Sequence, residues 1–140
     1  MKTSSYPRTP DNFVVPPLDL LPEALRPLGA EVHDLQARLA AEKRKRGELH
    51  TPGIDGRVFV ADNVYRERFI RDGGDPSEAG SPNADDLIVQ RKLADERVAG
   101  LTAATRGAVA DYSEALRQTA AETLPEALAA FGAAEAAYVE

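Results

Sequence analysis

The sequence predicts a mostly α-helical protein, an elongated helical hairpin of coiled-coil type with an extended proline-rich N-terminal arm and a loop-rich middle. Three observations predict this class. Leucine and valine recur at alternating spacings of three and four over residues 18–39, which is a heptad pattern. No proline occurs over residues 83–124, a stretch in which one set of residues recurs at spacings of three and four. Proline and glycine concentrate instead in residues 1–17 and 50–83.

The arm comprises residues 1–17. Its four prolines exclude a helix, because proline fixes φ and lacks an N–H group, and they favour extended backbone. Such a segment buries little by itself, so we expect a partner chain to hold it. Phe13, Val14 and Val15 are its predicted anchor.

The heptad helix occupies residues 18–49. Because proline is tolerated only in a first helical turn, we expect a short helical turn from Pro22, a bend, and a helix from Pro27 to Arg46. Basic residues 43–46 close that helix, where cations favour the C-terminal end of the helix dipole. We call its apolar side the first seam: Leu18, Leu21, Leu25, Leu28, Val32, Leu35 and Leu39.

Residues 50–83 are interpreted as a loop-rich segment, which carries Arg57, Arg66, Arg68 and Arg71 of the basic middle of the chain. Residues 57–60 (Arg-Val-Phe-Val) read as a short strand, and Asp62 reads as the N-cap of a short helix ending at Arg71. A strand over residues 64–70 fits the pattern equally well. Residues 72–83 read as a flexible linker.

A long helix is predicted over residues 84–140, capped by Ser81 or Asn83, with a break near Pro125. Residues 123–126 (Thr-Leu-Pro-Glu) resemble a capping box that starts a final helix, and a bend at Gly100 or Gly107 is a further expectation. We call its predicted buried side the second seam: Leu87, Ala94, Val98, Leu101, Thr105, Ala108, Tyr112 and Ala115.

Composition removes many kinds of chemistry. The chain has 140 residues, about one domain, and contains no cysteine, which excludes disulfides, thiolate nucleophiles and cysteine-based metal sites. Its histidines are His33 and His50, and neither has partners at metal-ligand or triad spacing. We therefore expect a non-enzyme with no cofactor and no metal. The N-terminus lacks a secretory signal and no segment is apolar enough to insert into a membrane, so we expect a cytoplasmic protein before assembly.

Charge is distributed unevenly. Residues 41–71 carry 8 basic and 5 acidic side chains, a net charge of +3, whereas residues 72–140 carry 5 basic and 13 acidic side chains, a net charge of −8. The acidic C-terminal half argues against nucleic acid as a partner along the whole chain. The opposite signs suggest partner surfaces of opposite charge, or head-to-tail self-association.

These features predict a structural subunit or accessory of a larger multi-chain particle, such as a phage capsid, connector or tail component, in which the chain joins a homo- or hetero-oligomeric assembly and forms part of a virion. The alternative is a small adaptor or regulator that binds DNA or an acidic protein through residues 43–71. A small enzyme is a third, weaker reading. The predicted partner contacts are Phe13, Val14, Val15, Leu18, Leu21, Leu25, Leu28, Val32, Leu35, Leu39, Lys43, Arg44, Arg46, Val98, Leu101 and Tyr112.

Overall fold

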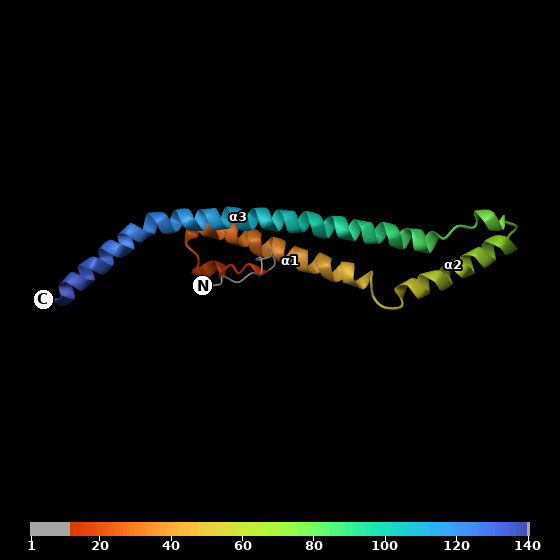
Figure 1. Ribbon diagram of the computed structural model, residues 1–140, viewed down its shortest axis with the longest axis horizontal. Coiled ribbons are helices and arrows are strands. Elements are labelled where there is room, and N and C mark those ends of the chain that lie inside the picture. Colours follow the sequence, from red (N-terminus) through yellow and green to blue (C-terminus); the bar gives the residue numbers. More distant parts are fainter. Residues whose placement is uncertain (1–11, 140) are drawn as a thin grey trace, which may run out of the picture. The chain divides into compact units, whose positions relative to one another are not determined.

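The protein is mostly helical, as predicted. The computed structural model describes the backbone of residues 12–139 and the side chains of residues 12–124. Three α-helices make up most of it: α1 (Arg26–Glu48), α2 (Ile54–Arg71) and α3 (Pro82–Val139) (Figure 1). Three short 3₁₀ helices accompany them, η2 (Leu18–Leu20), η3 (Glu23–Leu25) and η4 (Pro76–Glu78). Residues 12–139 contain no strand.

The chain divides into two compact units, which are described separately. Unit 1 consists of Met1–Gln36 and Ala103–Glu140, and unit 2 consists of Ala37–Thr102. Unit 1 therefore holds the proline-rich segment, η2, η3 and the first part of α1, together with the C-terminal part of α3. Unit 2 holds the end of α1, all of α2 and the start of α3.

The entry into α1 is built around prolines. Pro17 and Pro22 have φ values of −51° and −53° and directly precede η2 and η3. Their carbonyls accept hydrogen bonds from the Leu20 and Leu25 amides, both at 2.9 Å. Proline is suited to this place because its missing N–H would have no partner in a first turn. The helix expected from Pro27 to Arg46 is α1.

The first seam is largely buried inside the chain. Five of its seven side chains are buried, and the other two, Leu18 and Leu28, are half-buried. Val32 in unit 1 and Leu39 in unit 2 have no exposed surface. The buried members are Leu21, Leu25, Val32, Leu35 and Leu39.

Gly29 permits the close packing of the segment before α1. A Cβ atom placed on it would lie 2.7 Å from Leu21 Cδ1, 3.2 Å from Val15 Cγ1 and 3.3 Å from Leu18 Cδ2. Three side chains of the preceding segment therefore occupy the space that any other residue would need. Glycine has a lower helix propensity than alanine, but at this position it allows the close contact with the preceding segment.

Gly29→Val is expected to lower the free energy of unfolding by about 1–3 kcal/mol, the usual cost of overpacking a filled site. Chemical denaturation followed by circular dichroism measures it. Gly47→Val is the matched control, since it lies in the same helix and no atom approaches its Cβ position within 4 Å. Equal stability of the two variants would contradict the packing described at Gly29.

The middle of the chain differs from the sequence prediction. Residues 57–60 are not a strand but part of α2, which begins after Gly53, whose φ of 89° is readily adopted only by glycine. Asp62 lies within this helix and does not cap it. Helical winding turns Val58, Asp62 and Phe69 to one side, which tertiary contacts cover, and this overrides the strand preference of the β-branched residues.

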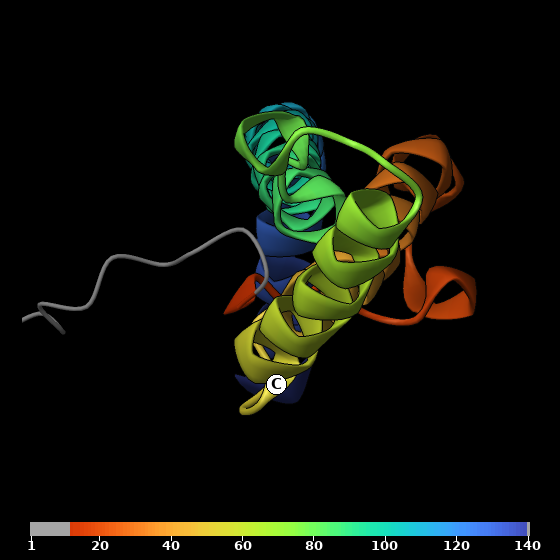
Figure 2. The ribbon, with the colours of Figure 1, turned by 90° about the vertical axis from the view of Figure 1, so that its right-hand side faces the viewer.

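The expected linker over residues 72–83 contains ordered structure. The side chain of Asp75 accepts a hydrogen bond from the Ser77 amide at 3.0 Å and so caps η4. Ala79 is buried, and Gly80 adopts a φ of 66°. This segment carries the chain from the end of α2 to the start of α3 (Figure 2).

The helix α3 is continuous through the positions where a break was expected. It runs from Pro82 to Val139 and passes through Gly100, Gly107 and Pro125. The predicted capping box at residue 123 does not form, because Thr123 Oγ1 donates to the carbonyl of Thr119 at 2.8 Å, one turn back. Its hydroxyl therefore does not serve as an N-cap. The backbone stays helical through Pro125, and the axis of α3 bends in this C-terminal part of the helix (Figure 1).

The second seam is the buried side of α3. Leu101 and Ala115 are half-buried, and the other six members are buried. In unit 2, Arg91 Nε donates to the carbonyl of Leu49 at 3.0 Å, and Arg46 lies 4.0 Å from Asp95, which joins α1 to α3. The members buried in one unit or the other are Leu87, Ala94, Val98, Thr105, Ala108 and Tyr112.

Candidate interaction site

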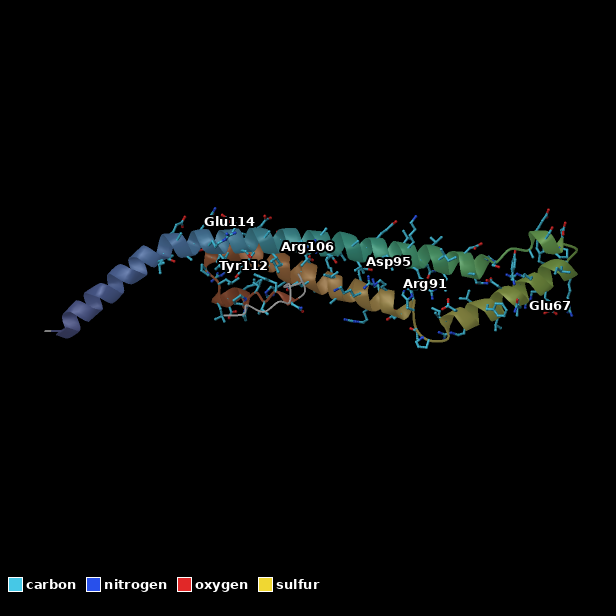
Figure 3. The ribbon with its side chains drawn as sticks, in the orientation of Figure 1. Glu67, Arg91, Asp95, Arg106, Tyr112 and Glu114 are labelled. Atoms are coloured by element: carbon cyan, nitrogen blue, oxygen red, sulfur yellow. The ribbon has the colours of Figure 1, made fainter. Side chains whose placement is uncertain are left out.

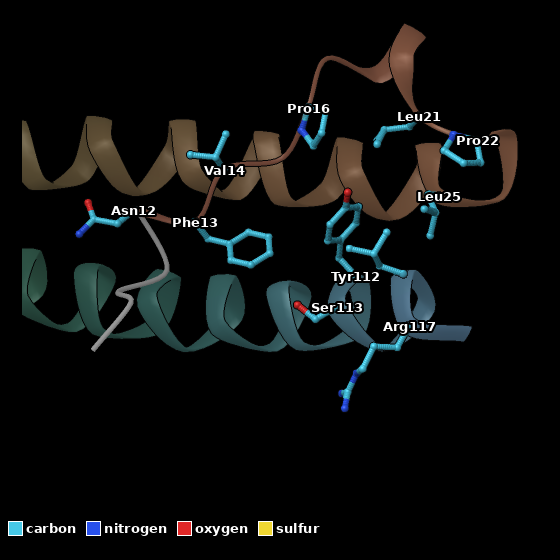
Figure 4. Close-up of a pocket in the computed structure, with 11 residues that line it drawn as sticks. Asn12, Phe13, Val14, Pro16, Leu21, Pro22, Leu25, Tyr112, Ser113 and Arg117 are labelled. Atoms are coloured by element: carbon cyan, nitrogen blue, oxygen red, sulfur yellow. The ribbon is translucent and has the colours of Figure 1, made fainter. Parts of the chain in front are cut away.

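An open apolar pocket lies in unit 1, between the segment that precedes α1 and the C-terminal part of α3 (Figure 4). Its volume is about 750 Å³. Aliphatic, proline and aromatic side chains form most of its wall. The lining residues are Asn12, Phe13, Val14, Pro16, Leu21, Pro22, Leu25, Tyr112, Ser113, Leu116 and Arg117.

Two side chains of α1 hold the extended wall of this pocket in place. Gln36 Nε2 donates to the carbonyl of Phe13 at 2.6 Å, and His33 Nε2 lies 3.1 Å from the carbonyl of Val15. Alternate carbonyls of an extended chain point the same way, and residues three apart on a helix share a face, so the two spacings match. Val15 is buried beneath this pair of contacts.

An aromatic contact joins the same segment to α3. The rings of Phe13 and Tyr112 meet edge to face, with centroids 6.0 Å apart and an interplanar angle of 79°. Tyr112 lies on the side of α3 that faces the segment, and Glu114 lies on the other side (Figure 3). The extended segment that forms the pocket wall is thus held in place by contacts to the carbonyls of Phe13 and Val15 and by the ring contact between Phe13 and Tyr112.

Exposed apolar groups surround the opening. Val14 is 84% exposed, whereas Phe13 before it is half-buried and Val15 after it is buried. Leu116 on α3 is 43% exposed, and Arg117 beside it pairs with Glu114 at 2.7 Å. The site offers shape and apolar surface, and its few polar groups form no nucleophile–base arrangement. Its chemistry suits the apolar side chains of another protein chain.

The structure brings together part of the predicted partner contacts. Phe13, Val14, Leu21, Leu25 and Tyr112 all line the pocket. Their role as contacts with another chain stays a prediction. Of the α3 residues that line the pocket, sequence reasoning found Tyr112 and missed Leu116. Leu116 follows Tyr112 by one helical turn and could have been found by that spacing.

The other predicted contacts lie elsewhere. Val32, Leu35, Leu39 and Val98 are buried inside their units, and Leu101 is half-buried. Of the basic residues, Arg44 is exposed, Lys43 is half-buried, and Arg46 pairs with Asp95 as described above. These basic residues do not line the pocket.

A second hollow, of about 450 Å³, lies in unit 2 between α2 and the start of α3. Its charged groups are paired. Arg91 makes a two-pronged contact with Asp55, at 3.1 and 3.2 Å, and this hydrogen bond holds the pKa of Asp55 below its ordinary value. Arg66 donates to the carbonyl of Gly80 and to the hydroxyl of Ser81. The charged groups of this hollow therefore serve to connect α2 with the segment before α3 and with α3 itself.

Asp62 caps α3 from a different helix. Its carboxylate accepts hydrogen bonds from the Asn83 amide at 2.9 Å, the Asn83 side chain at 2.9 Å and the Ala84 amide at 3.0 Å. These backbone N–H groups belong to the first turn of α3, which has no helical acceptors for them. Burial raises the pKa of Asp62, but the donated hydrogen bonds outweigh it and hold the pKa below 3.8.

Asp62→Asn is expected to lower the melting temperature at pH 7, because a neutral amide is a poorer acceptor for two first-turn N–H groups. The lowered pKa means that the carboxylate stabilises the fold fully above pH 3.8 and loses this effect as the pH falls through the folded-state pKa. The difference between the variant and the wild type should therefore narrow in acid. Thermal melts at pH 7 and pH 3 test this, with the exposed Asp111→Asn as control; a constant difference would contradict it.

Among the side chains that the structure describes, those of residues 12–124, no group of three or more His, Cys, Asp or Glu is placed to hold a metal ion. No helix of the described part of the chain is both long and apolar enough to cross a membrane.

No protein-family model, curated protein or solved structure matches the chain. The fold and the site by themselves define the class, a mostly helical protein with an open apolar pocket.

Proposed function

We propose that this chain is a non-enzymatic structural subunit of a multi-chain assembly, and that the pocket of unit 1 receives apolar side chains of a neighbouring chain. The observation that carries the proposal is the open apolar pocket, beside which Val14 keeps 84% of its surface exposed. Exposed apolar side chains at the mouth of an apolar hollow are typical of protein interaction sites.

The mostly helical structure is compatible with the same proposal. We further propose that the chain forms a helical hairpin with coiled-coil seams and a proline-rich arm, which suits a subunit that contacts several neighbours. A phage capsid, connector or tail accessory is the kind of particle component that we propose, on architecture alone. Phe13 and Tyr112 provide an aromatic wall of the type enriched at the centres of interfaces.

Light scattering during size-exclusion chromatography tests this proposal. We expect the wild-type chain to have a mass above that of its 15.1 kDa monomer and Leu116→Asp to reduce that mass, because a charge at the pocket mouth would be desolvated by the partner. Leu124→Asp is the matched control, as Leu124 is also an exposed leucine of α3 but does not line the pocket. Circular dichroism verifies that both variants are folded.

A chain that stays monomeric at every concentration, with or without Leu116→Asp, would overturn the assembly proposal. The second candidate function would then take its place. It is an adaptor that binds an acidic protein or DNA through residues 43–71, and it is favoured by the exposed arginines of α2, Arg57 and Arg68. Binding of a DNA duplex that weakens steeply with salt would distinguish DNA from an acidic protein as its partner.

A further inference from the structure

Two exposed helix faces in unit 2 carry opposite charge in the same layout. On α2, the side opposite the buried Asp62 presents what we call the basic stripe: Arg57, Val60, Val64, Arg68 and Arg71. On α3, the side opposite the second seam presents what we call the acidic stripe: Asp85, Val89, Leu93 and Glu96. All nine side chains are exposed.

The apolar centres of the two stripes are alike. Val60 and Val64 are 60% and 44% exposed, and they lie one helical turn apart. Val89 and Leu93 are 54% and 43% exposed, and they also lie one turn apart. Each pair is a small apolar patch on a helix face that no described residue covers.

The charges that flank the centres are spaced identically. Arg57 and Arg68 are 11 residues apart, and so are Asp85 and Glu96. At 1.5 Å per residue, each pair spans about 16 Å along its helix. When the two apolar pairs are placed against each other, the end residues of the two stripes therefore face one another. Arg57 and Arg68 then lie opposite the carboxylates of Asp85 and Glu96.

Countercharges do not cancel either stripe. On α2, Glu67 pairs with Arg71 at 3.1 Å and leaves Arg57 and Arg68 as the flanking cations; Glu67 lies on the side of α2 turned away from α3 (Figure 3). On α3, the exposed Lys92 and Arg97 border the acidic stripe on its two sides, and against them Asp85, Asp86 and Glu96 leave a net charge of −1.

The two stripes cannot meet within one chain. Asp62 and Arg66 of α2 contact residues at the start of α3, so α2 turns its other side toward the α3 of its own chain. The acidic stripe likewise lies opposite the buried side of α3. A surface that pairs with either stripe therefore belongs to another molecule.

We propose that the basic stripe of one copy of this chain docks on the acidic stripe of a second copy. The apolar pairs form the centre of the contact, and the arginine–carboxylate pairs set its register and suppress wrong partners. Such a contact is heterologous, since it joins two different surfaces. Each copy therefore uses one stripe toward one neighbour and the other stripe toward the next, which closes a ring or extends an array.

This inference names a second copy as a partner and uses a surface different from the pocket of unit 1. Its test is made with the full chain carrying Leu116→Asp, so that association through the pocket does not contribute. Variant A adds Arg57→Glu and Arg68→Glu, variant B adds Asp85→Arg and Glu96→Arg, and variant C combines all four reversals. Mass is measured by light scattering, and dissociation constants by analytical ultracentrifugation at low and high salt.

We expect the Leu116→Asp chain to self-associate, and variants A and B to do so at least about tenfold more weakly, because each places like charges against each other. A mixture of A and B should associate again, and so should variant C, since its charges are exchanged between the stripes. Lys45→Glu with Arg106→Glu is the control for the change in net charge, because both residues are exposed and lie outside the stripes.

Failure of rescue in variant C or in the mixture would overturn the proposed docking, even if A and B dissociate. A Leu116→Asp chain that is monomeric at every concentration would also overturn it, and would leave the pocket to be judged by its own variants. Conversely, association that responds to the stripe reversals but not to Leu116→Asp would uphold the stripes and overturn the pocket.

Discussion

Leu39→Asp is expected to lower the free energy of unfolding of the chain severely at 25 °C. Leu39 has no exposed surface and lies in unit 2, whose buried side chains include Ala94 and Val98, and no basic residue is among the buried side chains of the described chain. A carboxylate there must either stay charged without a partner or become protonated, and the apolar packing of the leucine is lost in both cases. Losses of about 4 kcal/mol or more are typical of such a change.

The size of this effect matters because domains of this size are stable by only about 5–15 kcal/mol. Circular dichroism and a urea titration measure it. Ala40→Asp is the matched control, since it introduces the same charge at the next residue of α1, which is exposed. Similar unfolding midpoints for the two variants would show that Leu39 is not part of a core.

Ala110→Pro is the second substitution with a large expected effect. Residue 110 lies in the interior of α3, where a proline removes the N–H that bonds to the carbonyl of Arg106 and pushes its ring against that carbonyl. The side chain at 110 is exposed, so the loss reports on the helix backbone and not on packing. We expect unit 1 to be destabilised by about 3 kcal/mol.

Ala110→Gly separates the backbone break from the loss of alanine. It should cost about 1 kcal/mol, because glycine only raises the entropy of the unfolded chain. Melting temperatures and helical content by circular dichroism distinguish the two. If both variants lose equally little, α3 is not a continuous helix at this position.

The helical class could be predicted from the sequence because its causes are local. The spacing of Leu25, Val32 and Leu39 places their side chains on one side of any helix, and all three are buried. The same holds for Val98 and Tyr112 on α3. Periodicity of this kind needs no knowledge of what covers the apolar side.

The errors arose where distant residues override a local preference. Residues 57–60 favour a strand by composition, yet they are helical because α2 must turn Asp62 toward Asn83, 21 residues further along the chain. Thr123 satisfies its hydroxyl one turn back, so its resemblance to a cap starts no new helix. Neither partner could be identified from the neighbouring residues.

The candidate site was predicted in part. The apolar character of Phe13, Val14 and Tyr112 pointed to contacts, and all three line the pocket. Their meeting depends on Gln36 and His33, which hold two carbonyls of the extended segment, and on the space left by Gly29. Those contacts join residues up to 23 positions apart and were invisible to any local pattern.

The sequence by itself determined that the chain is helical, which side of each long helix is apolar, and in which parts of the chain basic and acidic residues accumulate. Tertiary structure alone decided that Asp62 caps α3, that a pocket opens beside Val14, and that the basic and acidic stripes remain uncovered. The physical reason is that helix formation and amphipathicity depend on residues within about one turn. Burial and exposure depend instead on which distant side chains arrive to cover a surface.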